Sequence, residues 1–348
     1  MTRTEQFNQT LHTVANFNTE SLTSFLKRDF HRPLFITGSG GQASSSFAAL
    51  LYQAAGGFAQ FVTPYSMNSI SDKTLSLSKV LLSSCSGHNA DIQYIGNRCH
   101  NIIPSQTGFL CHSIDPERNK LLGKVAPDNL FYFPKSAETS PSGFVSSSIL
   151  NAAIIYKAFA GTLDPSDFDI ERSFSYFSNR SADAPLPLQE VRHFCVLHGS
   201  WSQPAATDLE SRFVESGMAS VQVCDYRNYC HGRFIFTSNH LGVKNTPRDM
   251  ALVLLVTPRE KSYVQRLLDL LPESVPVIVL ETDKDDSRAT LELFMQSIRL
   301  FDSVGDAHSI DPCNPVSRGG IDKRYPLNRL TFRSDFKGFG PLHIDFRL

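Results

Sequence analysis

A short serine-rich stretch in the first third of the chain carries the residue types that bind an anion. Ser84 to Gly87 follows an apolar run, Val80 to Leu82, and precedes a helical pattern that begins near His88. Unpaired main-chain N–H groups and the dipole at a helix N-terminus favour an anion, and serine hydroxyls add donors. The stretch has no Lys or Arg, so binding would rest on oriented dipoles. A serine-rich helix cap that binds nothing fits these residues equally well.

The same stretch resembles the phosphate loop of sugar isomerase (SIS) domains. Ser84 to Asp91 has the spacing of the family's Ser-x-Ser-Gly-x-Thr-x-Asp motif, which holds the phosphate of a sugar phosphate. Asn89 stands at the position of the Thr, and Cys85 stands where glucosamine-6-phosphate synthase has Gln. In the family, a Gly-Ser or Gly-Thr turn after the first strand also faces the sugar phosphate. The phosphate-binding residues that the resemblance implies are Ser39, Ser84, Cys85, Ser86, Gly87 and Asn89.

The turn after the first predicted strand has a rival interpretation. Gly38 to Ala43 fits the dinucleotide-binding pattern G-x-G-x-x-A between a strand and a helix. That interpretation needs an acidic residue near the end of the next strand to hold the ribose hydroxyls. The strand ends at residues 61–64, FVTP, with none. A nicotinamide-dependent enzyme is therefore a less favoured alternative.

Three charged residues share one face of a helix predicted over residues 204–216. Asp208, Arg212 and Glu215 are spaced four and three apart, which suits an exposed ion-paired stripe. They also resemble the Glu, Lys and Glu on the same helix of glucosamine-6-phosphate synthase, where the last Glu abstracts the proton beside the sugar carbonyl. The resemblance implies that Glu215 is the catalytic base and that Arg212 is the cation beside it.

A longer loop in the second half of the chain contains a candidate histidine. Residues 225–233 resemble the family's Glu-Leu-Lys-His-Gly stretch, with Asn228 in place of the Glu and with His231-Gly232 retained. The family's histidine serves ring opening of the cyclic sugar and reaches the site of a neighbouring subunit. The resemblance therefore implies a catalytic role for His231 and a homodimer, whereas a lone loop histidine is more often idle.

Composition restricts the partners of this chain. Its 348 residues are 41% hydrophobic, which suits two domains. The charges of thirty-three basic and thirty-four acidic residues nearly cancel, so nucleic acid and anionic membrane are not expected partners. The expected partner is a small molecule. We expect no secretory signal and no spanning helix, and seven scattered cysteines without Cys-x-x-Cys suit reduced thiols in the cytoplasm. No metal or organic cofactor is expected.

The elements that position these residues repeat. Strands alternate with helices, which predicts parallel sheets covered on both faces. Gly38 to Gly56 and Gly199 to Gly217 have equal lengths with a strand before, a helix within and a strand after, which indicates duplication. In the second copy, Thr257 to Glu260 replaces the serine loop. The expected fold is α/β, with two flavodoxin-like three-layer SIS domains, an N-terminal helix and a C-terminal tail.

The expected boundaries follow from composition shifts along the chain. A region from Gly161 to Leu188 holds no clear strand and looks like a linker, with some helix around Phe168 to Phe177. The predicted parts are a helical lead over 1–30, the first SIS domain over 31–165, a linker over 166–188, the second SIS domain over 189–305 and a tail over 306–348.

The tail and one polar segment add weaker candidates. Residues 321–331 resemble the family's C-terminal tail, which offers a Lys, but the matching place has none. Arg324 or Arg329 would be the substitutes, although arginine does not readily give the neutral amine of a Schiff base. Ser142 and Ser146 lie in a Ser-rich stretch that in the family closes over the ligand, and a solvent loop and helix cap explain them as well.

Together, these features favour an aldose–ketose isomerase, or a related deaminase or deglycase, that acts on a phosphosugar through an enediol. A non-catalytic sugar-phosphate sensor is the alternative from another class. It is favoured by Asn89, Asn228 and the missing tail Lys.

Overall fold

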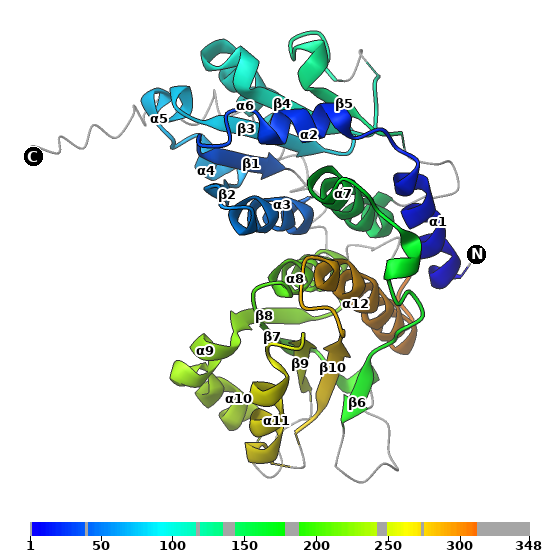
Figure 1. Cartoon of the computed structure of the whole chain (residues 1–348). Coiled ribbons are helices and arrows are strands. Elements are labelled where there is room, and N and C mark those ends of the chain that lie inside the picture. The colour runs from blue at the N-terminus through cyan, green and yellow to red at the C-terminus, as the bar shows by residue number, and fades with distance from the viewer. Residues whose placement is uncertain are drawn as a thin grey trace, which may run out of the picture. The chain divides into compact units, whose positions relative to one another are not determined.

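The computed structural model describes residues 2–38, 41–115, 119–134, 143–177, 188–241, 249–272 and 275–311. These residues form two compact units (Figure 1). The N-terminal unit takes the described residues within Thr13–Thr139 and Ile154–Leu163. The C-terminal unit takes those within Met1–His12, Ser140–Ala153 and Asp164–Val316.

The N-terminal unit is built on a parallel sheet of five strands in the order β2-β1-β3-β4-β5. The three central strands have five or six residues with an apolar middle, and they are fully buried because helices cover both faces. This order is the flavodoxin-like one, in which ligands bind outside the carboxyl ends of β1 and β3. The strands are β1 (Leu34–Gly38), β2 (Ala59–Phe61), β3 (Lys79–Ser84), β4 (Thr107–Cys111) and β5 (Leu130–Tyr132).

Helices lie on both faces of this sheet. On one face, residues of α4, α5 and α6 pack on Phe35, Val80 and Leu82 in one core cluster. On the other face, Phe25 of α2 packs on Phe131 of β5, with ring centroids 5.4 Å apart. The helices wholly in this unit are α2 (Glu20–Lys27), α3 (Gln42–Ala54), α4 (Pro64–Met67), α5 (Asp72–Ser76) and α6 (Ala90–Ile102). The unit boundaries divide α1 (Arg3–Ala15) and α7 (Gly143–Ala160), and the N-terminal unit takes α1 from Thr13 and α7 from Ile154.

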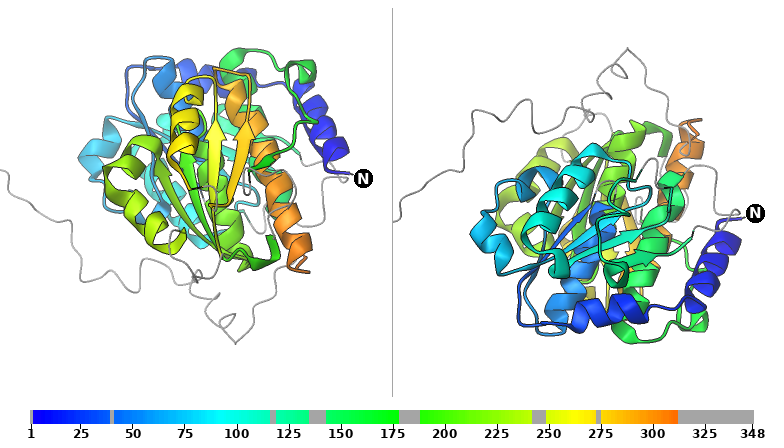
Figure 2. Two further views of the ribbon diagram at one scale, coloured as in Figure 1. Left: turned by 90° about the horizontal axis from the view of Figure 1, so that it is seen from below. Right: turned by 90° about the horizontal axis from the view of Figure 1, so that it is seen from above.

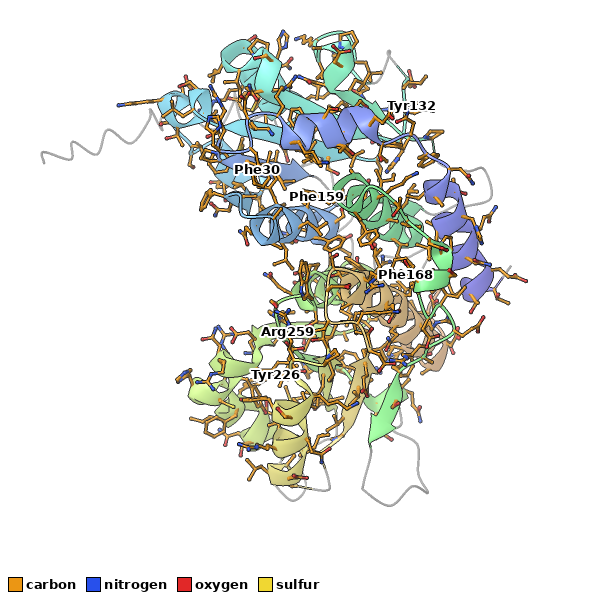
Figure 3. The ribbon with its side chains drawn as sticks, viewed as in Figure 1. Phe30, Tyr132, Phe159, Phe168, Tyr226 and Arg259 are labelled. Atoms are coloured by element: carbon orange, nitrogen blue, oxygen red, sulfur yellow. The ribbon has the colours of Figure 1, made fainter. Side chains whose placement is uncertain are left out.

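Aromatic rings join the helices of the second face to one another. Tyr52 of α3 contacts Phe30 and Phe159, the latter on α7, and both of these phenylalanines are labelled in Figure 3. The ring centroids lie 4.4 and 6.3 Å from that of Tyr52. The Tyr52 hydroxyl also donates to the carbonyl of Phe30. The end of the helical lead, at Phe30, is thereby part of the N-terminal unit's core.

Two lysines hold the ends of the leading helices in the N-terminal unit. Lys79 is fully buried, and its Nζ donates to the carbonyls of Phe25, Leu26 and Arg28 at 2.7, 3.1 and 2.6 Å. These carbonyls end α2, where the helix dipole favours a cation. Lys157 of α7 donates in the same way to three carbonyls at the end of α1. Burial lowers the pKa of Lys79 to about 8.

The C-terminal unit is built on a second five-stranded sheet in the order β6-β10-β9-β7-β8. Four strands are parallel, and the edge strand β6 runs antiparallel to β10. β6 lies in the region expected to have no strand, so that expectation is wrong. Its partner is about a hundred residues away in the sequence. The strands are β6 (Ser175–Phe177), β7 (His193–His198), β8 (Ser220–Asp225), β9 (Met250–Val256) and β10 (Val277–Glu281).

Helices cover both faces of this sheet as well. Phe213 of α8 stacks on Phe194 of β7 and meets Phe301 of α12 edge-on. The left view of Figure 2 shows the orange helix α12 beside the yellow-green strands. The opposite face carries the cluster that contains Tyr226, Tyr229 and Val264. The helices are α8 (Gln203–Ser216), α9 (Tyr226–Asn228), α10 (Phe234–Leu241), α11 (Lys261–Leu270) and α12 (Arg288–Ala307).

The duplication predicted from the sequence is present in both topologies. The order β8-β7-β9-β10 repeats the order β2-β1-β3-β4. The helix after the first strand of each copy ends beside a left-handed glycine, Gly56 (φ +94°) or Gly217 (φ +69°). The predicted α/β class with two flavodoxin-like units is therefore confirmed. Within the residues described, no helix is long and apolar enough to cross a membrane.

Candidate functional site

The serine-rich loop lies between the end of β3 and the start of α6. Its last residue, Asn89, caps the helix: the side-chain Oδ1 accepts from the N–H groups of Asp91 and Ile92 at 2.9 and 3.2 Å. Burial raises the pKa of the Asp91 carboxyl. The Asn89 amide thus caps α6 through its oxygen, and its Nδ2 group remains as a donor beside the loop.

The loop serines accept hydrogen bonds from the loop's own main chain. Ser84 Oγ accepts from Gly87 N at 3.1 Å, and Ser86 Oγ accepts from His88 N at 3.3 Å. A hydroxyl that accepts such a bond still has its proton to donate, so both serines can donate to an anion. Cys85 is half-buried, and its carbonyl accepts from His112 N at 3.0 Å.

Gly87 is required at its position for two reasons. Its φ of +68° lies in the left-handed region, which side chains rarely adopt. A Cβ there would also stand 2.1 Å from Nδ2 of Asn119. Asn119 is 1% exposed, and its Oδ1 accepts from Leu121 N, which fixes the orientation of the amide. The amide donor of Asn119 therefore packs against the loop.

Buried polar atoms without a partner gather at this edge of the N-terminal sheet. Within the described residues, eight buried side-chain atoms lack a hydrogen-bond partner, and half of them belong to Thr37, Ser45, Ser83 and Asn119. Thr37 and Ser83 lie near the ends of β1 and β3, and Ser45 lies in the first turn of α3. Each such atom costs about 1–3 kcal/mol unless a ligand or water pairs it.

Gly38, the last residue of β1, lies beside two of these residues. A Cβ on Gly38 would stand 2.9 Å from the Ser83 carbonyl oxygen and 3.1 Å from Ser45 Oγ. A side chain there would collide with the Ser83 carbonyl, so the position requires glycine. Sequence reasoning missed Thr37, Ser45, Ser83 and Asn119. Their types are ordinary, and no local pattern distinguishes a paired hydroxyl from an unpaired one.

The candidate acid and cation of α8 are buried as a pair. Arg212 Nε donates to Asp208 Oδ2 at 2.5 Å, and the two side chains are 3% and 7% exposed. Arg212 Nη2 also donates to Ser148 Oγ at 2.5 Å, and its guanidinium lies over the ring of Phe301. An exposed stripe therefore does not describe this pair.

Glu215 is placed differently from that pair. It lies one turn further along α8 and is exposed. Its Oε1 accepts from Ser211 Oγ at 2.7 Å. The carboxylate is thus the one member of the predicted trio that solvent reaches.

The candidate histidine lies in a turn that Asp225 organises. Asp225 ends β8, and its Oδ1 accepts from the N–H groups of Arg227 and Asn228 at 2.9 Å each. The Asn228 side chain donates back to Oδ2 of the same carboxylate. His231 is exposed in the π-helical turn Tyr229–Arg233 that follows, where Gly232 has a φ of +130°.

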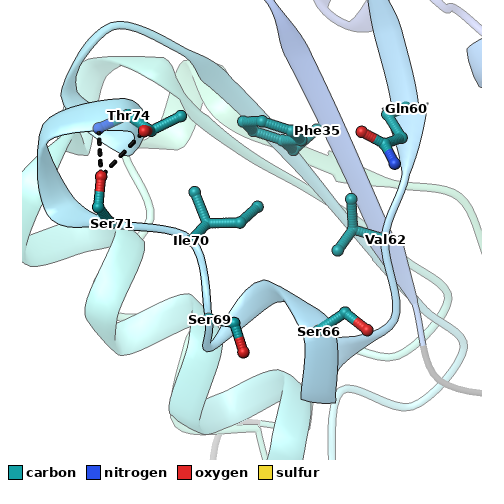
Figure 4. Close-up of a pocket in the computed structure, with 8 residues that line it drawn as sticks. All are labelled: Phe35, Gln60, Val62, Ser66, Ser69, Ile70, Ser71 and Thr74. Atoms are coloured by element: carbon teal, nitrogen blue, oxygen red, sulfur yellow. Dashed lines mark hydrogen bonds between the residues drawn. The ribbon is translucent and has the colours of Figure 1, made fainter. Parts of the chain in front are cut away.

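A groove elsewhere in the N-terminal unit is separate from the loop (Figure 4). Its volume is about 530 Å³, and it lies between the edge of the sheet at β1 and β2 and the segment that carries α4 and α5. The lining residues are Phe35, Gln60, Val62, Ser66, Ser69, Ile70, Ser71 and Thr74. None is charged and none belongs to the serine loop, so the groove is not the predicted phosphate site.

Several predicted residues lie outside the part of the chain that the structure describes. Ser39, Ser142, Arg324 and Arg329 are among the residues left out, and of Ser146 the structure describes only the main chain, within α7.

Solved structures of sugar-phosphate proteins share this fold. Glucosamine-6-phosphate deaminase from Thermotoga maritima is 15% identical with a TM-score of 0.59, over 89% of this chain and 98% of that one. Tagatose-6-phosphate ketose/aldose isomerase from Escherichia coli is 16% identical with a TM-score of 0.59, over 90% and 94%. The C-terminal domain of glucosamine-fructose-6-phosphate aminotransferase from Francisella tularensis is 14% identical with a TM-score of 0.59, over 89% and 95%.

These likenesses define the class of protein, an α/β chain with the duplicated fold of phosphosugar isomerases. The resemblance to SIS proteins that the serine loop indicated is thereby confirmed at the level of the fold. No protein-family model matches the sequence, and no curated protein matches it.

Proposed function

We propose that this chain binds a phosphorylated sugar at the carboxyl edge of its N-terminal sheet and acts on it as an aldose–ketose isomerase or a related deaminase or deglycase. The phosphate-binding residues in this proposal are Ser39, Ser84, Cys85, Ser86, Gly87 and Asn89. Glu215 moves the proton through an enediol, Arg212 is the cation that accompanies it, and His231 opens the ring.

One observation carries the phosphate part of the proposal. The unpaired atoms of Thr37, Ser45, Ser83 and Asn119 lie near the carboxyl ends of β1 and β3, the edge at which flavodoxin-like sheets bind ligands. The serine hydroxyls and the N-terminus of α6 add donors at the same edge. A small anion with several acceptor oxygens matches such a set of neutral donors. The named activities of the three similar structures, all on sugar phosphates or sugar amines, support the sugar class.

The flavodoxin-like strand order also weighs against the nicotinamide alternative. Dinucleotide-binding folds have the order 3-2-1-4-5-6, and the N-terminal sheet has 2-1-3-4-5. Thr63, which follows β2 where an acidic residue would hold ribose, instead caps α4 through its Oγ1. We therefore do not propose dinucleotide binding.

A thermal-shift panel of hexose, pentose and amino-sugar phosphates tests the binding site. At ~100 times its dissociation constant, a ligand should add about 2.7 kcal/mol to the free energy of unfolding. The double variant Ser84→Ala with Ser86→Ala should lose this shift. The matched control is Ser69→Ala, which removes a hydroxyl from the groove instead. Equal shifts in the double variant and in the control would refute the phosphate assignment.

Glu215→Gln tests catalysis. The amide keeps the shape of the side chain but cannot accept a proton. Turnover of the sugar phosphate identified by the panel should therefore fall at least a hundredfold while binding is kept. The size of this loss follows from the ~10²–10⁴-fold that a positioned base contributes to the rate. Glu210→Gln on the same helix makes the same charge change and serves as the control. Unchanged turnover in the Glu215 variant would leave this residue without a catalytic role.

A non-catalytic sugar-phosphate sensor is the second candidate, and the buried Arg212–Asp208 pair favours it. The guanidinium is engaged by Asp208 and Ser148 and is 3% exposed, so it is held as part of the core. Asn228, which replaces the family's Glu, is likewise bonded to Asp225. A sensor would show ligand-induced stabilisation with no turnover of any phosphosugar, and Glu215→Gln would change neither.

We also propose that the chain forms a homodimer. Phe234, Ile235 and Phe236 follow the His231 turn and are 45%, 55% and 46% exposed. Three consecutive large apolar residues at the start of α10 form a patch that a second copy of the chain would cover. The resemblance of the His231 segment to one that reaches a neighbouring subunit supports the same surface.

A further inference from the structure

The C-terminal unit has a loop at the place that corresponds to the serine loop. Thr257 to Glu260 joins β9 to α11, as residues 85–89 join β3 to α6. Glu260 directly precedes α11, as Asn89 directly precedes α6. Arg259 of this loop is labelled in Figure 3. β9 and β7 are neighbours in their sheet, as β3 and β1 are in theirs. The two loops therefore occupy equivalent switch points, the places at the carboxyl edge of a sheet where the strand order reverses.

A carboxylate lies at this second switch point. Glu260 Oε2 accepts from both Thr257 N at 3.0 Å and Thr257 Oγ1 at 2.5 Å. Its Oε1 lies 1.9 Å from the place where a Cβ on Gly199 would stand, so the carboxylate reaches the turn after β7. Gly199 corresponds to the glycine turn after β1. The carboxylate of Glu260 therefore lies between the loop after β9 and the turn after β7.

The two units differ in how their donors are satisfied. In the N-terminal unit, Ser83 and Ser45 have hydroxyls without partners at the switch point. In the C-terminal unit, the described atoms of the two turns at residues 199–202 and 257–260 include no buried side-chain atom without a partner. The N–H and hydroxyl of Thr257 both donate to the carboxylate of Glu260. This is one half of a helix capping box, because the Glu260 N–H donates to the Thr257 carbonyl at 3.1 Å and not to Thr257 Oγ1.

We infer that the Glu260 carboxylate is a built-in anion that occupies the second switch point and prevents phosphate from binding there. The chain then binds at most one phosphate per copy through its switch points. Removing the carboxylate leaves the N–H and hydroxyl of Thr257 without their acceptor, and an external anion replaces it. This inference stands on the C-terminal unit alone and does not need the N-terminal site to bind a sugar.

Glu260→Ser tests the inference with inorganic phosphate as the probe. Serine is a good N-cap, so α11 keeps its first turn while the carboxylate is lost. Isothermal titration calorimetry and ³¹P NMR should show one more phosphate bound per chain than in the wild type, with a dissociation constant in the millimolar range. Asp269→Asn is the control, because it removes an equal charge near the other end of α11, away from the loop. Adding Thr257→Val to Glu260→Ser should abolish the gain.

The possible results separate this inference from the proposed function. A gain of one equivalent supports the inference whether the wild type binds one phosphate or none. Equal binding by the wild type and a folded Glu260→Ser variant overturns it. Should the variant not fold, the amide resonance of Thr257 in the wild type decides. It should stay fixed while phosphate is titrated, and a saturable shift would overturn the inference.

Discussion

At the scale of single residues, the candidate site depends on a glycine and on atoms left without partners. The side chains of Ser84 and Asn89 hold the loop between them through hydrogen bonds to the main chain, and Asn119 packs against Gly87. A protein core normally pairs such groups, so the four unpaired ones at one edge support the proposed binding site.

Gly87→Ala should damage both stability and binding. The residue has a φ of +68°, and its new Cβ would meet Asn119 Nδ2 at 2.1 Å. Strain of this kind costs about 1–3 kcal/mol, measurable by urea denaturation, and the sugar-phosphate thermal shift should be lost. Gly123→Ala is the control, because a Cβ there meets nothing within 4 Å. Similar behaviour of the two variants would show that Gly87 has no special role.

Arg212→Met should destabilise the chain by about 3–5 kcal/mol, because it leaves Asp208 buried without its partner. Adding Asp208→Leu should recover much of that loss, since both charges are then gone. Arg259→Met breaks the exposed pair with Asp285 and should cost less than ~1 kcal/mol. Urea denaturation of the four proteins measures these differences. An equal cost for Arg212→Met and Arg259→Met would contradict the burial of the first pair.

At the scale of elements, the sequence predicts the central strands and three of the four edge strands, and it misses the edge strand β6. Continuous apolar runs such as Leu252 to Val256 can only be buried, and the structure has strands at each of them. The strand β6 has three residues and pairs far along the chain, so no local pattern marks it. The lead predicted over residues 1–30 divides into two helices, α1 and α2.

The site shows the same division between local and distant information. The serine loop and the cap at Asn89 are local, and the spacing alone places them at the start of α6. Burial of Asp208 and Arg212 depends on Ser148 and Phe301, which lie far away in the sequence. Charged residues at helical spacing are usually exposed, so their pattern indicated the commoner outcome.

Lys79→Met tests the contact that holds the end of α2. Burial lowers the pKa of Lys79 from 10.5 to about 8 in the folded chain. Between pH 8 and 10.5 the unfolded chain binds more protons at this residue than the folded chain does. The free energy of unfolding of the wild type should therefore rise with pH from about 8 to 10.5, and below pH 8 this added stability is absent. The free energy of unfolding, measured for both proteins at several pH values, should show the wild type's advantage over Lys79→Met growing across that range. A constant difference would contradict it.

At the scale of the whole molecule, one fold is present twice and the copies have diverged at the same place. The first copy has neutral donors at its switch point, and the second has the carboxylate of Glu260. The shared strand order shows that the framework tolerates both, because the loops after β3 and β9 lie outside the sheets. Duplication thus separates the requirements of folding from those of ligand binding.

The homodimer proposal is tested at this scale. Replacing Phe234 and Phe236 with serine should shift the chain from dimer to monomer in light scattering coupled to size-exclusion chromatography, because the patch at the start of α10 loses its apolar character. Phe58→Ser is the control, since Phe58 is 61% exposed and lies in the other unit. A dimer that persists in the double variant would remove α10 from the interface.

The half-buried thiol of Cys85 can report whether a ligand occupies the serine loop. Burial raises the pKa of Cys99 to about 12 and that of Cys111 to about 11, so these thiols react slowly, whereas Cys230 is exposed. In a Cys230→Ser background, alkylation of Cys85 followed by peptide mass spectrometry can be timed with and without each sugar phosphate. A compound that occupies the loop shields this sulfur, so the natural ligand can be sought by protection of one residue before any reaction has been found.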